Sequence, residues 1–217
     1  MKKLTLLLLF LITVAIGTAQ QLYVEGGKTL ASFDYKDSQG QGIDNLQTTN
    51  HSYMALGYRS QLFVEKLNGS LGISYAGYGA IGSDDVVGNF MEWDVNYFEF
   101  KAGLDYEMFN IKEAVIYIKG TTSAGFLVNG SQTLNSKVIN LKNEVDFDKT
   151  VINLGIGFGF SYSISEKLSF YTQYMYRKSL ALKSGTTNNA DLEELRIISH
   201  NLSFGLLINI SDKPSKF

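Results

Sequence analysis

Large apolar residues alternate with small or polar residues along most of the chain beyond residue 20. The clearest stretch covers residues 150–164, where Ile, Leu, Phe and Tyr alternate with Gly, Asn and Ser. Residues 98–108 and 198–210 show the same period of two, and helical periodicity is almost absent. Alternation of this kind predicts β-strands with one apolar and one polar face.

The alternation divides the chain into eight predicted strands. They cover approximately residues 22–33, 52–64, 70–80, 98–108, 114–128, 150–164, 168–180 and 198–210. Short connections at 65–69, 109–113 and 165–167 alternate with long polar ones at 34–51, 81–92, 129–149 and 181–194. Asn68-Gly69 predicts a tight hairpin turn, because both residue types accept positive φ angles. Residues 134–145 could add a hairpin, which would give ten strands or one tall hairpin above the membrane.

Composition indicates which face points inward. The chain has 21 Gly, 14 Phe, 13 Tyr and one Pro. Eight antiparallel strands close most simply into a barrel. Glycine and serine on the polar face suit a crowded, narrow lumen, and the apolar face then meets lipid. The many aromatic residues suit girdles at the lipid interfaces. We therefore predict an all-β fold, a single antiparallel up-and-down transmembrane β-barrel with short periplasmic turns and long extracellular loops. The alternative is a periplasmic lipocalin-like carrier that holds an apolar ligand inside.

The first segment is typical of a secretory signal peptide. Met1-Lys2-Lys3 precedes an apolar run from Leu4 to Gly17, and Gly17-Thr18-Ala19 offers small residues for cleavage. The run is shorter than the roughly 20 residues that a membrane-spanning helix needs. We predict a signal peptide over residues 1–19 and a barrel domain over residues 20–217, exported to the cell outer membrane.

Several stretches carry a resemblance to known barrels. They are Leu56-Gly57-Tyr58-Arg59, Tyr78-Gly79-Ala80-Ile81-Gly82-Ser83-Asp84, Glu92-Trp93-Asp94 and Ser199-His200-Asn201-Leu202-Ser203-Phe204-Gly205. With them the chain resembles the small eight-stranded outer-membrane barrels of the OmpA/OmpX-like class, and also uncharacterised barrels of the Bacteroidota. The resemblance implies a Gram-negative cell envelope, with outer-membrane lipid and lipopolysaccharide as partners. Such barrels usually end on an aromatic residue, whereas here Phe217 follows Pro214, beyond the last predicted strand.

The predicted inward face carries four acidic and four basic side chains. They are Glu25, Arg59, Glu99, Lys101, Asp105, Glu107, Lys119 and Arg177. Unpaired charges in a narrow lumen would be costly, so we expect them to pair across the barrel and plug it. A narrow gated path for ions or water is the alternative. Lys28 falls on the lipid face, where a bulge at Gly26-Gly27 would redirect it.

Little in the sequence points to chemistry. The absence of Cys excludes thiolate metal sites and cysteine nucleophiles, and a net charge of −2 argues against nucleic-acid binding. His51 and His200 lie near the loop-side ends of strands, but the neighbouring Ser199 should point away from His200. The acidic residues Asp84, Asp85, Glu92 and Asp94 lack the spacing of a calcium loop.

We therefore expect a non-enzymatic barrel without cofactor or metal, which displays surface loops for adhesion, envelope stability or partner binding. The alternative is a lipid-active barrel enzyme that uses a histidine at the rim.

Overall fold

The computed structural model describes residues 20–36, 41–42, 45–84, 89–143, 150–182 and 194–210. The predicted signal peptide, the C-terminal Phe217 and the acidic residue Asp85 lie outside these ranges. The described part contains nine strands and one short 3-10 helix, η1 (Leu141–Asn143). The strands are β1 (Gln20–Lys36), β2 (Gln47–Gln61), β3 (Leu67–Asp84), β4 (Asn89–Ile111), β5 (Ala114–Leu134), β6 (Lys137–Asn140), β7 (Val151–Ser163), β8 (Leu168–Ser179) and β9 (Glu194–Asn209). None of the described helical residues forms a helix long and apolar enough to cross a membrane.

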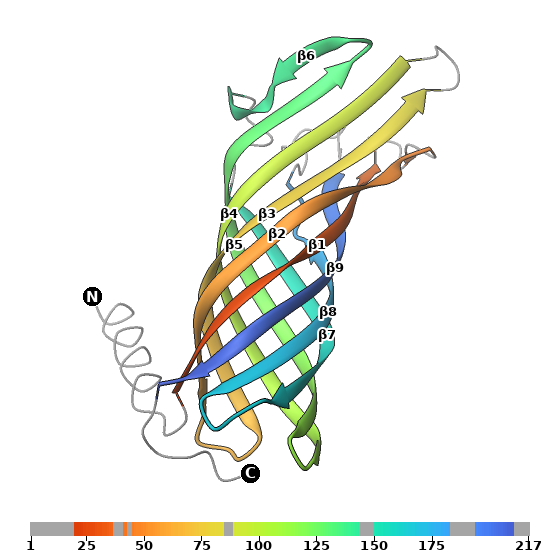
Figure 1. The fold of residues 1–217 in the computed structure, drawn as a ribbon. Coiled ribbons are helices and arrows are strands. Elements are labelled where there is room, and N and C mark those ends of the chain that lie inside the picture. The colour runs from red at the N-terminus through yellow and green to blue at the C-terminus, as the bar shows by residue number, and fades with distance from the viewer. Residues whose placement is uncertain are drawn as a thin grey trace, which may run out of the picture.

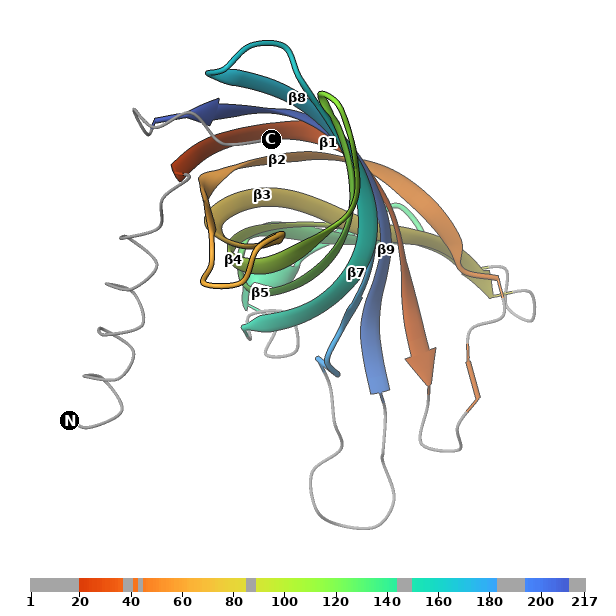
Figure 2. The same cartoon turned by 90° about the horizontal axis from the view of Figure 1, so that it is seen from below.

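The strands form one antiparallel sheet that closes on itself (Figures 1 and 2). Eight of them make the ring, because β4 pairs with β5, β5 with β7, and β9 with β1. The short β6 pairs with the upper part of β5 and stands outside the ring. The predicted up-and-down barrel is therefore confirmed, and the region considered for an extra pair of strands forms one tall hairpin instead.

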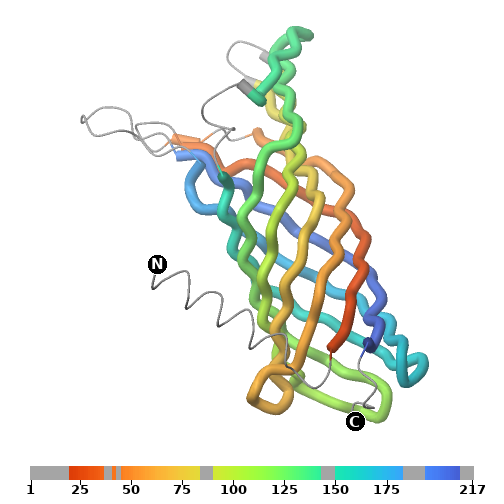
Figure 3. Tube along the Cα trace, turned by 90° about the vertical axis from the view of Figure 1, so that its left-hand side faces the viewer, coloured from red at the N-terminus to blue at the C-terminus, as the bar shows by residue number. Residues whose placement is uncertain are grey.

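The register defines how steeply the strands tilt. A path that starts at Leu22 on β1 and steps from each residue to its paired residue on the next strand passes once around the ring. It returns to β1 at Ser32, ten residues further along the strand. A shift of this size requires strongly tilted strands, as in other narrow barrels. The strands also extend well into the predicted loops. The wall made by β3, β4 and β5 rises above the rest of the barrel, with β6 at its top (Figures 1 and 3).

The turn residues differ from the prediction in one place. Asn68 and Gly69 lie within β3, paired with Asp105 and Leu104 of β4, so the predicted Asn-Gly turn is wrong. The chain reverses earlier, over residues 62–66, where Lys66 takes the positive φ of 67°. A two-residue turn with positive φ at both positions, Asn135 and Ser136, joins β5 to β6. Positive φ at both positions is the geometry that matches the twist of a hairpin.

The two faces of the sheet point as predicted for a membrane barrel. Large apolar side chains on the outer face stay exposed, for example Ile156 at 68%, Phe158 at 60% and Leu56 at 56%. The alternating positions are buried and mostly polar, small or tyrosine. A lipocalin-like carrier requires the opposite arrangement, so that alternative is wrong. An apolar exterior around a polar interior is the arrangement of a transmembrane barrel.

Lys28 is exposed on the outer face, and no bulge redirects it. The pairing of β1 with β2 and β9 continues without a shift through Gly26 and Gly27, so the predicted bulge is wrong. The tilt explains why the charge is tolerated. Lys28 lies opposite Ser52, and the tilt brings Lys178 and His200 to nearly the same height on the outer face. These four polar residues lie together towards the upper end of the apolar band, where Leu30 and Leu180 are still exposed.

Candidate functional site in the barrel lumen

Asp105 holds the part of the lumen nearest the short turns. Its Oδ2 accepts hydrogen bonds from Arg59 Nη2 at 2.5 Å and Nε at 3.1 Å, and Lys119 Nζ lies 4.0 Å from Oδ1. Arg59 also donates to Gln21 Oε1 at 2.7 Å and lies 3.6 Å from Glu107 Oε1. Charge-assisted contacts of this kind are shorter and stronger than neutral hydrogen bonds. They tie β1, β2, β4 and β5 together at this end of the barrel.

Glu25 lies further up the lumen and is held by neutral donors. Its carboxylate accepts hydrogen bonds from Tyr171 at 2.9 Å, Gln173 at 2.8 Å and Ser203 at 2.7 Å. Lys101 donates to the Tyr53 hydroxyl at 2.5 Å. Glu25 on β1 is thus bound to β8 and β9, and Lys101 on β4 to β2.

Glu99 and Arg177 form the third group, on β4 and β8. Arg177 Nη2 donates to Glu99 Oε2 at 2.7 Å and to Ser123 Oγ at 2.7 Å. The other donors to the Glu99 carboxylate are Ser74 at 2.9 Å, Tyr78 at 2.7 Å and Asn153 at 3.1 Å. Glu99 is fully buried and Arg177 is 5% exposed. A buried carboxylate with this many donors is satisfied, which is the condition for keeping a charge out of water.

The structure places all eight sequence-predicted charges on the inner face. Six are buried, whereas the side chains of Arg59 and Glu107 keep 13% and 21% exposure near the mouth. Ion pairs join Arg59 to Asp105 and Glu107, Lys119 to Asp105, and Arg177 to Glu99. Glu25 and Lys101 are held by hydrogen bonds to neutral groups instead. The sequence pattern identified the charges but not these neutral partners.

Tyrosines fill much of the remaining lumen. Six buried ones lie there, namely Tyr23, Tyr53, Tyr78, Tyr97, Tyr117 and Tyr171. The expectation that tyrosines occupy the interfacial girdles is therefore wrong for these six. The signal was present in the alternation, because Tyr23 and Tyr171 occupy positions on the polar face of their strands.

Inward glycines make room for these rings. A Cβ on Gly205 would lie 2.4 Å from Tyr171 Cζ, and one on Gly159 would lie 2.3 Å from Tyr117 Cζ. Real Cβ atoms do not approach carbon so closely, so a side chain at either position would displace the ring. Gly205 thereby lets Tyr171 reach Glu25. The sequence predicted glycine for a crowded lumen, and here each of these glycines leaves a space that a tyrosine ring occupies. We call such a space a lumen socket.

An apolar layer covers the charged groups towards the long-loop end. Phe33, Val95, Val151 and Ile197 are buried there at 6%, 0%, 1% and 1% exposure. Trp93 packs edge-on against Phe33, with ring centroids 5.9 Å apart. The lumen therefore holds buried charges intermixed with tyrosines, and an apolar layer towards the long-loop end. A closed barrel with an apolar exterior belongs in a membrane, and barrels of this class are outer-membrane proteins.

Comparison with known proteins finds similarity in fold alone. No protein-family model matches the sequence, and no curated protein matches it either. Among solved structures, the chain is similar to the outer membrane protein OprG from Pseudomonas aeruginosa, with 12% identity, 88% of this chain and 97% of that chain covered, and a TM-score of 0.49. It is also similar to Neisserial surface protein A, with 14% identity, 87% and 97% covered, and a TM-score of 0.47. A third is the outer membrane protein AlkL, with 11% identity, 92% and 94% covered, and a TM-score of 0.45.

The two histidines lie outside the lumen. His200 faces outward, and its Nδ1 lies 2.6 Å from the Tyr174 hydroxyl, whereas Ser199 is buried on the inner face. His51 packs over Gly77 and Gly79, with Nε2 2.7 Å from Thr49 Oγ1 and Nδ1 3.7 Å from Asp94 Oδ1. Within the described ranges, no group of His, Asp and Glu is arranged to hold a metal ion.

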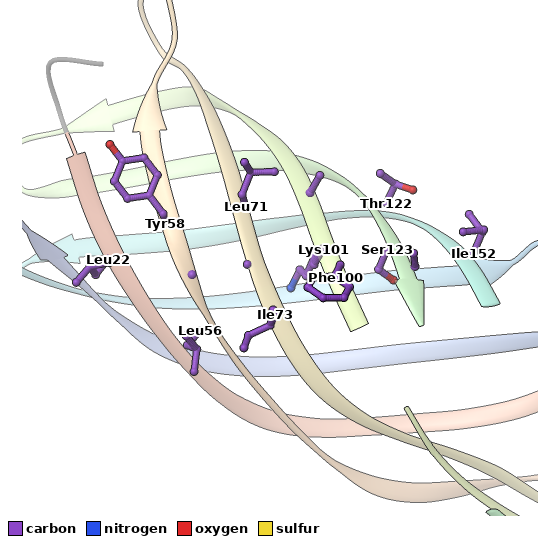
Figure 4. Close-up of a pocket in the computed structure, with 14 residues that line it drawn as sticks. Leu22, Leu56, Tyr58, Leu71, Ile73, Phe100, Lys101, Thr122, Ser123 and Ile152 are labelled. Carbon is purple, nitrogen blue, oxygen red and sulfur yellow. The ribbon is translucent and has the colours of Figure 1, made fainter. Parts of the chain in front are cut away.

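A large depression lies on the membrane-facing wall (Figure 4). It has a volume of about 730 Å³ and crosses strands β1 to β5 and β7. Its lining is almost entirely apolar and includes Leu56, Leu71, Phe100 and Ile152. This surface offers mainly apolar packing to lipid.

Proposed function

We propose that the protein is a non-enzymatic outer-membrane barrel with a sealed, charge-plugged lumen. It anchors a raised extracellular wall and loops that serve adhesion, envelope stability or partner binding. The observation that carries the proposal is the filled lumen. Opening a path would break the Glu99–Arg177 contact at 2.7 Å and displace the apolar layer above it. Aqueous channels need barrels of about sixteen strands, twice as many as close this ring.

Conductance in planar lipid bilayers tests the sealed lumen. The refolded protein should give no current steps above those of protein-free bilayers, whereas a porin of about sixteen strands serves as the positive control. Correct insertion is checked by the heat-dependent change in gel migration that folded barrels show. Stable current steps from inserted protein would contradict the proposal and favour the gated ion path.

The raised wall supports the display role. β4 and β5 reach Asn89 and Leu134, and the β5–β6 hairpin stands at the top of the wall (Figure 3). Replacing residues 131–140 by an Asn-Gly turn should leave the barrel folded, because they lie above the part of β5, residues 114–125, that pairs with β7 to close the ring. Cells making this variant should then survive SDS treatment as poorly as cells lacking the protein. If cells making the variant and cells lacking the protein both survive SDS as well as wild-type cells do, a role in envelope stability is excluded.

The non-enzymatic part of the proposal has its own test. Ser199 lies on the opposite face from His200, so His200 cannot activate it. His51 is the histidine that the test must address, because its Nε2 lies 2.7 Å from the Thr49 hydroxyl and its Nδ1 lies 3.7 Å from Asp94. The double variant His51→Ala, His200→Ala should leave the lipid A and phospholipid profiles of the cells unchanged. A changed profile would favour the lipid-active enzyme.

A further inference from the structure

The outer face of the raised wall has a polar hollow just above the apolar band. It has a volume of about 200 Å³ and is lined by strands β4, β5 and β6 and by η1. The lining residues are Asp94, Asn96, Asn129, Gly130, Ser131, Asn140 and Lys142. The cross-strand pairs Asp94–Ser131, Asn96–Asn129 and Ser131–Asn140 fix their positions. We call it the Asn hollow.

The Asn hollow faces outward, away from the lumen. Asp94 and Asn96 alternate with Val95 and Tyr97, which are fully buried on the inner side. Asn129 and Ser131 flank Gly130, whose Cβ would face Val95 and Leu141 of the core. The polar side chains between them therefore point to the opposite side, where the membrane surface lies.

Its chemistry is that of uncharged hydrogen bonding. Three carboxamides and a hydroxyl provide both donors and acceptors. The Asp94 carboxylate accepts from Asn96 at 3.2 Å but stays 56% exposed, and Lys142 supplies one opposite charge. In the described part of the chain, the Asn129 and Ser131 side chains have no hydrogen-bond partner. Asn140 Oδ1 accepts from the Lys142 N–H at 2.9 Å, which leaves its Nδ2 and the Asn96 Oδ1 for a ligand beside the whole Asn129 carboxamide. Balanced charge with these remaining amide donors and acceptors suits sugar hydroxyls better than a bare phosphate or a divalent cation.

An aromatic surface lies directly below the Asn hollow. Phe98 on β4 pairs with Phe126 on β5. This pair occupies the next outward positions below the Asn96–Asn129 pair, and a β-bulge lies between the two pairs. Phe100 packs edge-on against both rings, at centroid distances of 5.4 Å and 6.1 Å. Phe100 and Phe126 are 56% and 47% exposed to the membrane. The wall thus offers polar groups above and apolar rings below at the height where lipid headgroups meet acyl chains.

We propose that the Asn hollow binds one sugar of an outer-leaflet glycolipid, whose acyl chains lie against the three phenylalanines. The occupant follows from position and chemistry together, because outer-leaflet headgroups at this height carry sugars. The sugar hydroxyls hydrogen-bond to Asn96, Asn129 and Asn140, and Asp94 accepts from a further hydroxyl. This site does not depend on the lumen, so it can stand if the sealed lumen is refuted.

The test uses rough-type lipopolysaccharide as the probe. The full-length protein is folded in a zwitterionic detergent, and binding is followed by native mass spectrometry and by titration. The key variant is Asn96→Ala, Asn129→Ala, which removes two outward amides, one half-buried and one exposed. The matched control is Asp34→Asn, Lys178→Gln, which changes an outward polar pair on β1 and β8 that is joined at 2.9 Å. Each lost hydrogen bond should weaken binding about fivefold.

We expect one tightly held lipopolysaccharide on the wild type and the control, and at least tenfold weaker binding to the key variant. Lipid-free core oligosaccharide should compete, whereas phosphatidylethanolamine vesicles should not. Equal binding by the key variant and the wild type would overturn the proposal, as would competition by phosphatidylethanolamine alone. If the key variant fails to fold, Ser131→Met fills the same hollow and should weaken binding equally.

Discussion

Replacing Arg177 by Met removes the cation from the Glu99 carboxylate but keeps a side chain of similar length. Glu99 would keep Ser74, Tyr78 and Asn153 as donors, but its charge would remain buried without a counter-charge. Breaking one partner of a buried ion pair costs about 3–5 kcal/mol. Ser123 would also lose the Arg177 donor at 2.7 Å. We therefore expect Arg177→Met to lower the free energy of unfolding by about 3–5 kcal/mol.

The double variant Glu99→Gln, Arg177→Met separates charge from packing. Removing both charges is often nearly neutral, so the double variant should recover most of the loss. Urea unfolding in lipid vesicles measures this, with the fluorescence of the single Trp93 as the signal. Trp93 suits the purpose because it packs against Phe33 in the layer above the ion pair. The single variants Glu99→Gln and Arg177→Met are measured beside the double variant. If their losses in unfolding free energy simply add in the double variant, Glu99 and Arg177 do not stabilise the barrel as a coupled ion pair.

Two further substitutions test the lumen sockets and the membrane edge. Gly205→Ala should lower the free energy of unfolding by about 1–3 kcal/mol through overpacking against Tyr171, as measured by the same urea titration. The loss should shrink in a Tyr171→Ala background, and an equal loss there would contradict the socket. Lys28→Leu should change the free energy of unfolding by less than about 1 kcal/mol, because charges near the interface cost little. A stabilisation of about 2–4 kcal/mol would instead place Lys28 at the bilayer midplane.

The architecture could be predicted from the sequence because a period of two is a local signal. Alternation in 150–164 and 98–108 located strands and separated their faces without any knowledge of their partners. The Asn68-Gly69 turn was mispredicted, since its φ preference is weaker than the pairing of β3 with β4, which begins at Leu67. The position of Lys28 near the membrane edge could not be predicted either, because it depends on the strand tilt. The tilt is a property of the closed ring and not of any single strand.

The partners within the lumen could not be predicted for the same reason. Glu25 is bound by residues 146 to 178 positions away in the chain, and the contact forms only once β8 and β9 close against β1. Tyrosine was ambiguous because it suits both a membrane interface and a polar interior. Only the position of each tyrosine in the alternation distinguished an inward ring from one at the membrane interface. An inward glycine on the neighbouring strand, such as Gly205 opposite Tyr171, is the second sign of an inward ring.

The contacts across the lumen connect walls that are not neighbours in the sheet. Glu99 on β4 binds Arg177 on β8 and Asn153 on β7, and Glu25 on β1 binds Tyr171 and Gln173 on β8. In a low-dielectric interior each of these contacts is expensive to break, because the freed charge would have no water to replace its partner. Any opening of the lumen must break several together. Evolution of a new activity is therefore less constrained on the outer face and the raised wall, where Asn96 and Asn129 can change without disturbing this network.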